Sequence, residues 1–262
     1  MNDIDERNIK LNEFMPEKIA FCFLTYDNIV RYDIWNKFFK DVDEQKYTVF
    51  IHPKNININT EKYIFKINII KNRVITKSKS DITIVDATLR LLIEAHNSNN
   101  ITHFIFLSQS CIPLYNFNIL YNIITKFPLS VISSISNNKT ERYIQLSSYI
   151  KNYFHMNNFV KQQPNMILIR SDVKLLIEHN LTSYFKNIEC PDEHYFINIL
   201  VNIFKKDIIK RQINFCNNDF RKTQALDFHF VDKIFIDKIR SYGFLFMRKV
   251  NNKSIINLEY LL

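Results

Sequence analysis

The sequence predicts an α/β fold, in which helices flank a central sheet whose strands are mostly parallel. Short apolar runs of the buried-strand type alternate with segments whose apolar residues recur at helical spacing. The chain opens with a strand over 18–26, a helix over 29–38 and a second strand over 46–53. Such alternation is typical of parallel strands joined by crossover helices. Ligands of open α/β sheets bind at the carboxyl ends of the strands, so polar residues there are the first site candidates.

The remaining elements follow from the same patterns. We expect Ser80 or Asp81 to cap a helix over 82–97, and Ser171 to cap another. Residues 134–163 are polar, contain tyrosines and show no clear period, which we interpret as a substrate-side insertion. The other expected elements are a weak strand at 62–70, an exposed loop at 71–80, strands at 103–113, 129–134, 165–170 and 243–250, and helices at 116–127, 171–180, 189–205 and 231–241.

Length and composition indicate one domain. The chain has 262 residues, 47% of them apolar, which is enough to bury a substantial core. We expect a charged leader at 1–17, a single domain at 18–250 and a C-terminal tail at 251–262, without a transmembrane segment, because no run of eighteen apolar residues occurs. The formal net charge of +9 favours anionic partners, although a solvated basic surface explains it equally well.

Glycine and cysteine usage excludes several kinds of site. Gly243 is the single glycine, so a P-loop, a dinucleotide-binding fingerprint and a kinase glycine loop are all excluded. Side chains and helix ends must therefore hold any bound nucleotide. The cysteines Cys22, Cys111, Cys190 and Cys216 form no CxxC or CxxH pair, which argues against a structural zinc site.

The stretch ECPDEHYFINIL, residues 189–200, starts an apolar helix with Asp192, Glu193 and His194 in a row. Consecutive helical residues point about 100° apart, so these three cannot converge on one metal ion. Counting on in steps of three and four from Glu193 meets apolar residues, whereas His194 shares its row with Asn198 and Asn202. Glu193 therefore faces inward, either as a catalytic base near the positive helix end or as a glutamate that caps its own helix.

Two further groups of charged residues have both a functional and a structural interpretation. The Asp-x-Asp strings at 41–43 and 3–5 follow a helical segment and lie in the leader, so we interpret them as solvated charges and assign no metal. Arg248 and Lys249 close the last predicted strand, and Arg221 lies in a polar loop upstream. Fixed cations can neutralise a departing diphosphate in place of a metal ion; a basic edge strand is the alternative.

Several phrases together resemble the core-2/I-branching β-1,6-N-acetylglucosaminyltransferase family (glycosyltransferase family 14), in its plant-type and microbial branch with xylosyltransferase relatives. The resemblance spans about residues 18–250. It is carried by KIAFCFLTYDNIVRYDIWNKFF with YTVFIHPK, ITIVDATLRLLIEA, FIFLSQSCIPLYNF, NMILIRSDVKLLIE, CPDEHYFINIL and FLFMRKV. It implies a GT-A-like, Rossmann-type fold, and transfer of a sugar, with GlcNAc expected, from a UDP-sugar to a hydroxyl of a glycan or glycoprotein. Inversion at the anomeric carbon and independence of divalent metal are implied as well.

The resemblance also implies roles for residues. Glu193 matches the general base, and Lys249, with Arg248 beside it, matches the cation that stabilises the leaving diphosphate. A second basic residue of the family falls near Leu226, which leaves Arg221, His229 and Lys233 as candidates. The remaining matches are Thr25, Tyr26 and His52 at the uridine-binding strand ends, and Ser108, Gln109 and Ser110, joined by Asp192, on the donor and acceptor floor.

The chain departs from the family pattern in three ways. Gln109 stands where the family has glutamate, and residues 162–165 lack the family's Gly-Ser-Gln-Trp, which removes an aromatic platform on the acceptor side. The chain also shows neither the family's membrane anchor nor its cysteine framework, so we expect a soluble, cytoplasmic protein rather than a Golgi enzyme. We expect no cofactor and no nucleic-acid partner. A basic polyanion-binding module and a catalytically inactive sugar-binding homologue are the alternatives.

Overall fold

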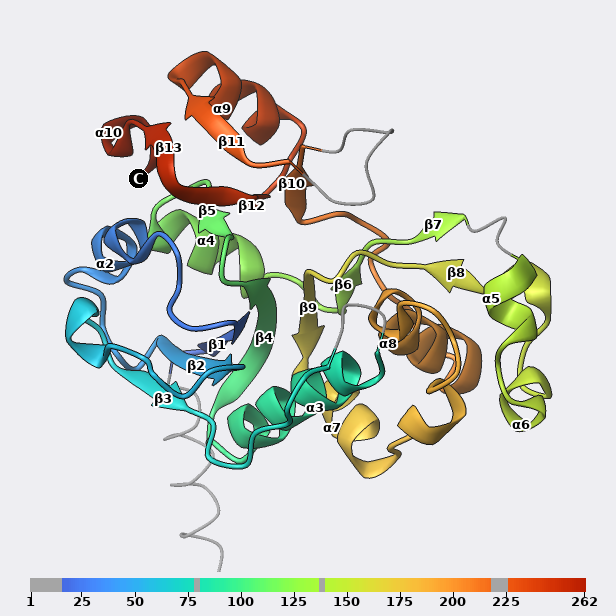
Figure 1. The fold of residues 1–262 in the computed structure, drawn as a ribbon. Coiled ribbons are helices and arrows are strands. Elements are labelled where there is room, and N and C mark those ends of the chain that lie inside the picture. Colours follow the sequence, from blue (N-terminus) through green and yellow to red (C-terminus); the bar gives the residue numbers. More distant parts are fainter. Residues whose placement is uncertain (1–15, 78–80, 137–139, 218–225) are drawn as a thin grey trace, which may run out of the picture.

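The computed structural model describes residues 16–77, 81–136, 140–217 and 226–262 (Figure 1). A six-stranded sheet of order β3-β2-β1-β4-β9-β6 forms its centre. The first four strands of that order are parallel, and β9 runs antiparallel to both of its neighbours. The strands are β1 (Lys18–Thr25), β2 (Tyr47–Pro53), β3 (Ile67–Ile69), β4 (Ile101–Ser108), β6 (Val131–Ile132) and β9 (Met166–Ile169). The predicted α/β class with a mostly parallel sheet is confirmed.

Helices cover both faces of this sheet. Residues of β1 alternate between the faces: Cys22 packs with α3 (Thr83–His96) and α7 (Arg170–Glu178), while Phe21 packs with α2 (Tyr32–Phe39) and α4 (Phe117–Ile124). This division follows from the period of two in a strand. Both faces are buried, which explains why β1 reads as a continuous apolar run. The residue at the N-cap position of α3 is the apolar Ile82, which makes no side-chain cap, although Asp81 accepts a hydrogen bond from the Thr83 backbone N–H at 2.9 Å; Ser80, the other predicted cap, lies outside the described residues.

The C-terminal segment is part of the folded domain. Strand β12 (Phe246–Arg248) pairs with β10 (Asn214–Cys216) and, antiparallel, with β5 (Ile112–Pro113), which brings Arg248 to the carboxyl end of β4. Residues 251–262, predicted as a tail, instead complete β13 (Val250–Ile256) and form α10 (Leu258–Leu261). These elements pack with β11 (Phe228–Val231) and α9 (Lys233–Ser241) and bury Leu261, so the apolar residues near the end close a small core of their own.

The region interpreted as an insertion lies beside α8 (Tyr195–Asn198), away from α9 and α10 (Figure 1). It contains the paired strands β7 (Ile135–Ser136) and β8 (Val160–Lys161), helices α5 (Thr140–Ile144) and α6 (Ser148–Lys151), and a 3-10 turn at Met156–Asn158.

The helix predicted over 189–205 is broken into three pieces, which corrects that prediction. A 3-10 turn at Pro191–Glu193 is followed by α8 (Tyr195–Asn198) and a π-helical stretch at Ile199–Ile203. Gln162 explains the first break. Its backbone N–H donates to the Glu193 carbonyl at 2.7 Å, and its side-chain Oε1 accepts from the Ile197 N–H at 2.7 Å. Both partners of the helical bond that would join residues 193 and 197 are thus taken.

The predicted cap at Ser171 is also wrong. Helix α7 begins one residue earlier, at Arg170, and has no side-chain cap because the apolar Ile169 precedes it. None of the helices among the described residues is both long and apolar enough to span a lipid bilayer.

Candidate active site

Two neighbouring cavities open at the carboxyl edge of the parallel strands. Their volumes are about 530 Å³ and about 420 Å³, and both are lined by Ser108, Arg248 and Lys249. We call them the base cavity and the cation cavity, because Glu193 lines the first and Lys54 and Lys77 line the second. They lie where the strand order reverses between β1 and β4, the position at which open α/β sheets bind ligands.

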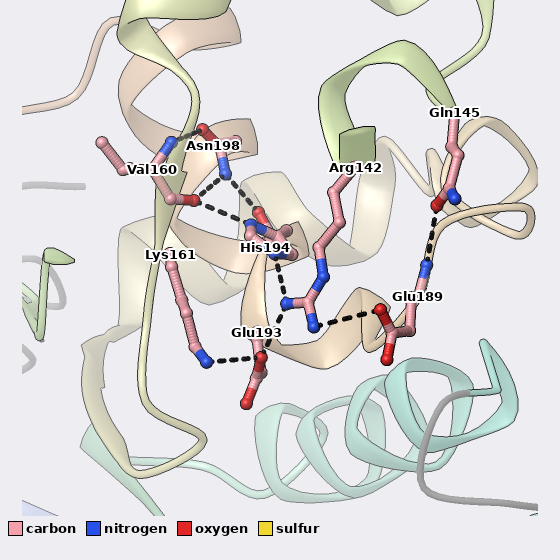
Figure 2. A network of polar contacts seen from close by, with 8 residues as sticks. All are labelled: Arg142, Gln145, Val160, Lys161, Glu189, Glu193, His194 and Asn198. Carbon is pink, nitrogen blue, oxygen red and sulfur yellow. Dashed lines mark hydrogen bonds and ion pairs between the residues drawn. The ribbon is translucent and has the colours of Figure 1, made fainter. Parts of the chain in front are cut away.

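Glu193 is held in the base cavity by two cations. Its Oε2 atom lies 2.9 Å from Arg142 Nη1 and 2.9 Å from Lys161 Nζ. Both cations come from the insertion, Arg142 from α5 and Lys161 from β8. Figure 2 shows the second carboxylate oxygen directed away from both of them. The Oε2 atom of Glu193 therefore fixes the side chain, and the other carboxylate oxygen is not needed for the bonds to these two cations.

The surroundings of Glu193 keep it ionised. Burial by itself would raise the pKa of this carboxyl, but the hydrogen bonds and charges of Lys161 and Arg142 outweigh burial and lower the pKa below its usual value. At neutral pH the group is thus a carboxylate that can accept a proton.

His194 is a neutral structural residue. Arginine can only donate, so the contact between Arg142 Nη1 and His194 Nε2 at 3.1 Å requires Nε2 to be an acceptor. The proton then lies on Nδ1, which donates to the Val160 carbonyl at 3.0 Å. Burial lowers the pKa of His194 to about 4, in agreement with the neutral ring.

A buried polar ladder ties α8 to β8. Asn198 donates to the Val160 carbonyl at 2.8 Å and accepts from the Val160 N–H at 3.1 Å, while Asn202 donates to Asn198 at 2.9 Å. The row of His194, Asn198 and Asn202 seen in the sequence is therefore buried, and its amides bond the backbone of the insertion. This ladder fixes Lys161, the residue after Val160, relative to Glu193 (Figure 2).

Asp192 lines the base cavity next to Glu193 but lacks that residue's cationic partners. Its Oδ1 atom is buried without a hydrogen-bond partner. Burial, with the nearby negative charge of Glu193, raises the pKa of Asp192 from its ordinary 3.8 to about 7, although Arg248 and Lys161 act in the opposite direction. The two adjacent acids consequently have opposite pKa shifts.

Arg248 is held in place by a hydrogen bond to a network of buried asparagine side chains. Its Nη1 donates to Asn165 Oδ1 at 3.3 Å, and the same oxygen accepts from Asn214 Nδ2 at 2.9 Å. Asn165 in turn donates to the Phe106 carbonyl of β4 at 3.1 Å. This network anchors the guanidinium between the two cavities. The Nε atom of Arg248 is buried without a partner.

Tyr26 and Gln109 shape the wall of the cation cavity. The Tyr26 side chain is 53% exposed, and its backbone N–H donates to Gln109 Oε1 at 2.6 Å. Gln109 also accepts from the Val30 N–H through its carbonyl at 3.0 Å, so it holds the loop after β1 at both ends. The Lys54 ammonium lies 5.4 Å from the centre of the Tyr26 ring. Thr25 and Ser110 line the same cavity.

Other sequence-predicted residues lie elsewhere. His52 is fully buried, accepts a hydrogen bond from the Val74 N–H at 3.0 Å and lines neither cavity. Burial lowers its pKa to about 4, so it is neutral. His229 and Lys233 are exposed and line neither cavity, and Arg221 lies outside the described residues. The Asp-x-Asp string at 41–43 follows α2 away from both cavities, and the string at 3–5 is also outside the described residues.

Sequence reasoning missed the two cations on Glu193. Arg142 and Lys161 lie 51 and 32 residues before it, in a region without periodicity, so no local pattern pointed to them. Gln162 stood out only as a departure from the family pattern, although it shapes the turn that carries Glu193. Among the described residues, no group of three or more histidine, cysteine, aspartate and glutamate side chains is placed to hold a metal ion.

Comparisons with known proteins point to one family. The profile of the Core-2/I-Branching enzyme family matches residues 19–240. Glycosyltransferase BC10 of Oryza sativa subsp. japonica is 27% identical over 129 residues, which cover 48% of this chain and 32% of that protein. The chain thus matches about a third of the length of this curated relative.

Solved glycosyltransferase structures show a weaker likeness. Galactosyltransferase LgtC with donor and acceptor sugar analogues has a TM-score of 0.40 at 10% identity, covering 69% of this chain and 70% of its own. Apo mouse xyloside xylosyltransferase 1 has a TM-score of 0.44 at 10% identity, covering 91% of this chain and 100% of its own.

The fold and the site define an α/β protein with Glu193, Arg248 and Lys249 at the switch point of its sheet. The family match covers most of the chain. The chain therefore belongs to the Core-2/I-Branching enzyme family, and the predicted family is confirmed.

The pKa of Asp192 predicts a pH-dependent effect on stability. The folded protein holds this proton up to about pH 7, whereas the unfolded chain releases it near pH 3.8, so Asp192 costs the native state stability as pH rises through that window. An asparagine side chain cannot titrate, so Asp192→Asn is expected to exceed the parent in free energy of unfolding at pH 8 by up to about 4 kcal/mol. The difference should close toward pH 4.

Urea unfolding between pH 4 and pH 8 measures this effect. The matched control is Glu178→Gln, which removes an acid that is 52% exposed and pairs with Lys174 on the surface of α7. A stability difference for Asp192→Asn that does not change with pH would contradict the shifted pKa.

Proposed function

We propose that this protein is an inverting glycosyltransferase that moves a sugar, with GlcNAc as the expected donor, from a UDP-sugar to a hydroxyl of a glycan or glycoprotein acceptor. Glu193 acts as the general base, and the reaction needs no divalent metal. The observation that carries the proposal is the placement of an ionised, cation-anchored Glu193 in one cavity and of Arg248 and Lys249 at its junction with a second, cationic cavity.

The cation cavity suits the nucleotide diphosphate. Among the described residues that line it are the cations Lys54, Lys77, Arg248 and Lys249 and one acid, Asp227. A diphosphate leaving group gains negative charge as the glycosidic bond breaks, and fixed cations stabilise that charge in the transition state. The exposed ring of Tyr26 offers a flat surface on which a uracil base can stack.

The base cavity suits the acceptor hydroxyl and the transferred sugar. In an inverting displacement the acceptor oxygen attacks the anomeric carbon as the bond to the diphosphate oxygen breaks on the opposite side. The attacking hydroxyl transfers its proton to Glu193, whose Oε2 stays bonded to Arg142 and Lys161 while the other oxygen accepts. Base and leaving-group cations must then lie on opposite sides of the sugar, which their positions in two adjoining cavities allow.

Removing the base is expected to stop turnover without preventing donor binding. Glu193→Gln keeps the shape of the side chain but cannot accept the proton, so turnover should fall by about 10²–10⁴-fold. The readout is UDP release in the presence of a UDP-sugar and acceptor, with UDP affinity measured in parallel. Glu178→Gln serves as the surface control. Undiminished turnover in Glu193→Gln would assign the base elsewhere.

Activity is expected to be unaffected by EDTA, because Arg248 and Lys249 supply the positive charge at the leaving diphosphate. UDP release is measured with EDTA, and again after addition of excess Mn²⁺. Loss of activity in EDTA that Mn²⁺ restores would disprove the metal-free mechanism.

The pH dependence of kcat/KM should reveal the effect of Lys161 on the pKa of Glu193. Lys161 lowers the pKa of Glu193, so Lys161→Met should raise that pKa and move the acid limb of kcat/KM to higher pH by on the order of one unit. Lys174→Met, which removes a surface lysine that is 61% exposed, should leave the limb in place. An acid limb that does not move in Lys161→Met would show that the limb belongs to a group other than Glu193.

A further inference from the structure

The base cavity contains two buried polar atoms that lack partners. Most polar side chains around them already have hydrogen bonds: Lys161 bonds Glu193, Gln162 bonds the Ile197 N–H, and Asn165 bonds the Phe106 carbonyl. Of the described residues that line this cavity, those with a buried, unpartnered side-chain atom are Asp192, at Oδ1, and Arg248, at Nε. A buried polar atom without a partner is costly, so the pair calls for a bound group.

The chemistry of the two atoms selects that group. Arg248 Nε–H can only donate, whereas the Asp192 carboxyl accepts when ionised and can donate or accept when protonated. A hydroxyl satisfies both at once, because it accepts through its oxygen and donates its proton. Water could do the same, but a sugar ring presents several hydroxyls at fixed spacing and also fills apolar space, such as that beside Phe196 and Leu24 in this cavity.

The location of Arg248 indicates which sugar binds there. Arg248 lines both cavities, and the diphosphate is assigned to the cation cavity. The sugar of a nucleotide-sugar is joined directly to that diphosphate, so it must enter the base cavity past Arg248 and reach Asp192 before the acceptor does. We infer that Asp192 binds a hydroxyl of the transferred sugar together with Arg248 Nε–H, and so determines which donor sugar is accepted.

This inference rests on the proposed function and adds to it a specificity-determining residue. It differs from the role of Glu193, because Asp192 contacts the donor sugar and leaves proton abstraction to its neighbour. It also separates the two halves of the donor: Asp192 should affect binding of the sugar and have no effect on binding of the nucleotide.

The test compares UDP with intact UDP-sugars. Calorimetric affinities are measured for UDP, UDP-GlcNAc, UDP-xylose, UDP-glucose and UDP-galactose in the parent, Asp192→Ala, Asp192→Asn and the surface control Glu178→Gln. Asp192→Ala should weaken the preferred UDP-sugar about 10–100-fold, the effect of losing one hydrogen bond to a charged group, while UDP affinity stays within about twofold. Asp192→Asn retains one acceptor oxygen and should lose less. The differences in affinity among the four UDP-sugars should become smaller in Asp192→Ala.

The possible results separate the two proposals. Unchanged affinity for every UDP-sugar in Asp192→Ala, or an equal loss for UDP and the UDP-sugars, would overturn the inference while leaving the proposed function intact. UDP affinity also serves as the folding control, because Asp192 does not line the cation cavity. A parent protein that binds none of these nucleotides would overturn the proposed function itself.

Discussion

The bonds from Arg142 and Lys161 to one oxygen of Glu193 are the contacts on which the site depends. A carboxylate in a largely apolar cavity loses hydration that its walls cannot replace, and two cations at 2.9 Å compensate for this loss. Both cations belong to the insertion, so the position of Glu193 depends on the packing of α5 and β8 beside the turn that carries it. The neutral ring of His194 and the amide of Asn198 secure that packing through the Val160 backbone.

The two neighbouring acids show how backbone geometry assigns different chemistry to similar groups. Asp192 and Glu193 occupy successive positions of a 3-10 turn, and of the two it is Glu193 that forms ion pairs with Arg142 and Lys161. Glu193 keeps a low pKa and stays charged, whereas burial raises the pKa of Asp192 to about 7, so its charge changes near physiological pH. A group that is charged throughout the working range suits proton acceptance, and a group with an unpartnered buried oxygen suits ligand binding.

Periodicity in the sequence predicted the strands and helices whose pattern follows from local burial. It missed features that depend on residues distant in the sequence. The apolar run of β1 and the helical spacing of apolar residues in α3 predict a strand and a helix from the sequence alone. The apolar row that begins at Glu193 indicated that this residue faces inward, which made it a candidate site residue. The break after Glu193 was not predictable in this way, because Gln162, far away in the sequence, takes both partners of the helical bond. The row of His194 is polar, which is typical of a solvent-facing row, but it is buried against the insertion backbone.

The scarcity of glycine explains why side chains, and not a glycine-rich backbone loop, supply the positive charge of the cation cavity. With Gly243 as the single glycine, the backbone offers no close-fitting phosphate loop, and side chains from several elements supply the positive charge instead. Gln109 also affects the net charge of the cation cavity. Its Oε1 accepts the Tyr26 N–H, a bond that the glutamate of the family pattern could also make. The amide makes it without adding a negative charge to the cavity wall, so the loop after β1 keeps its position while the cation cavity keeps its excess of positive charge.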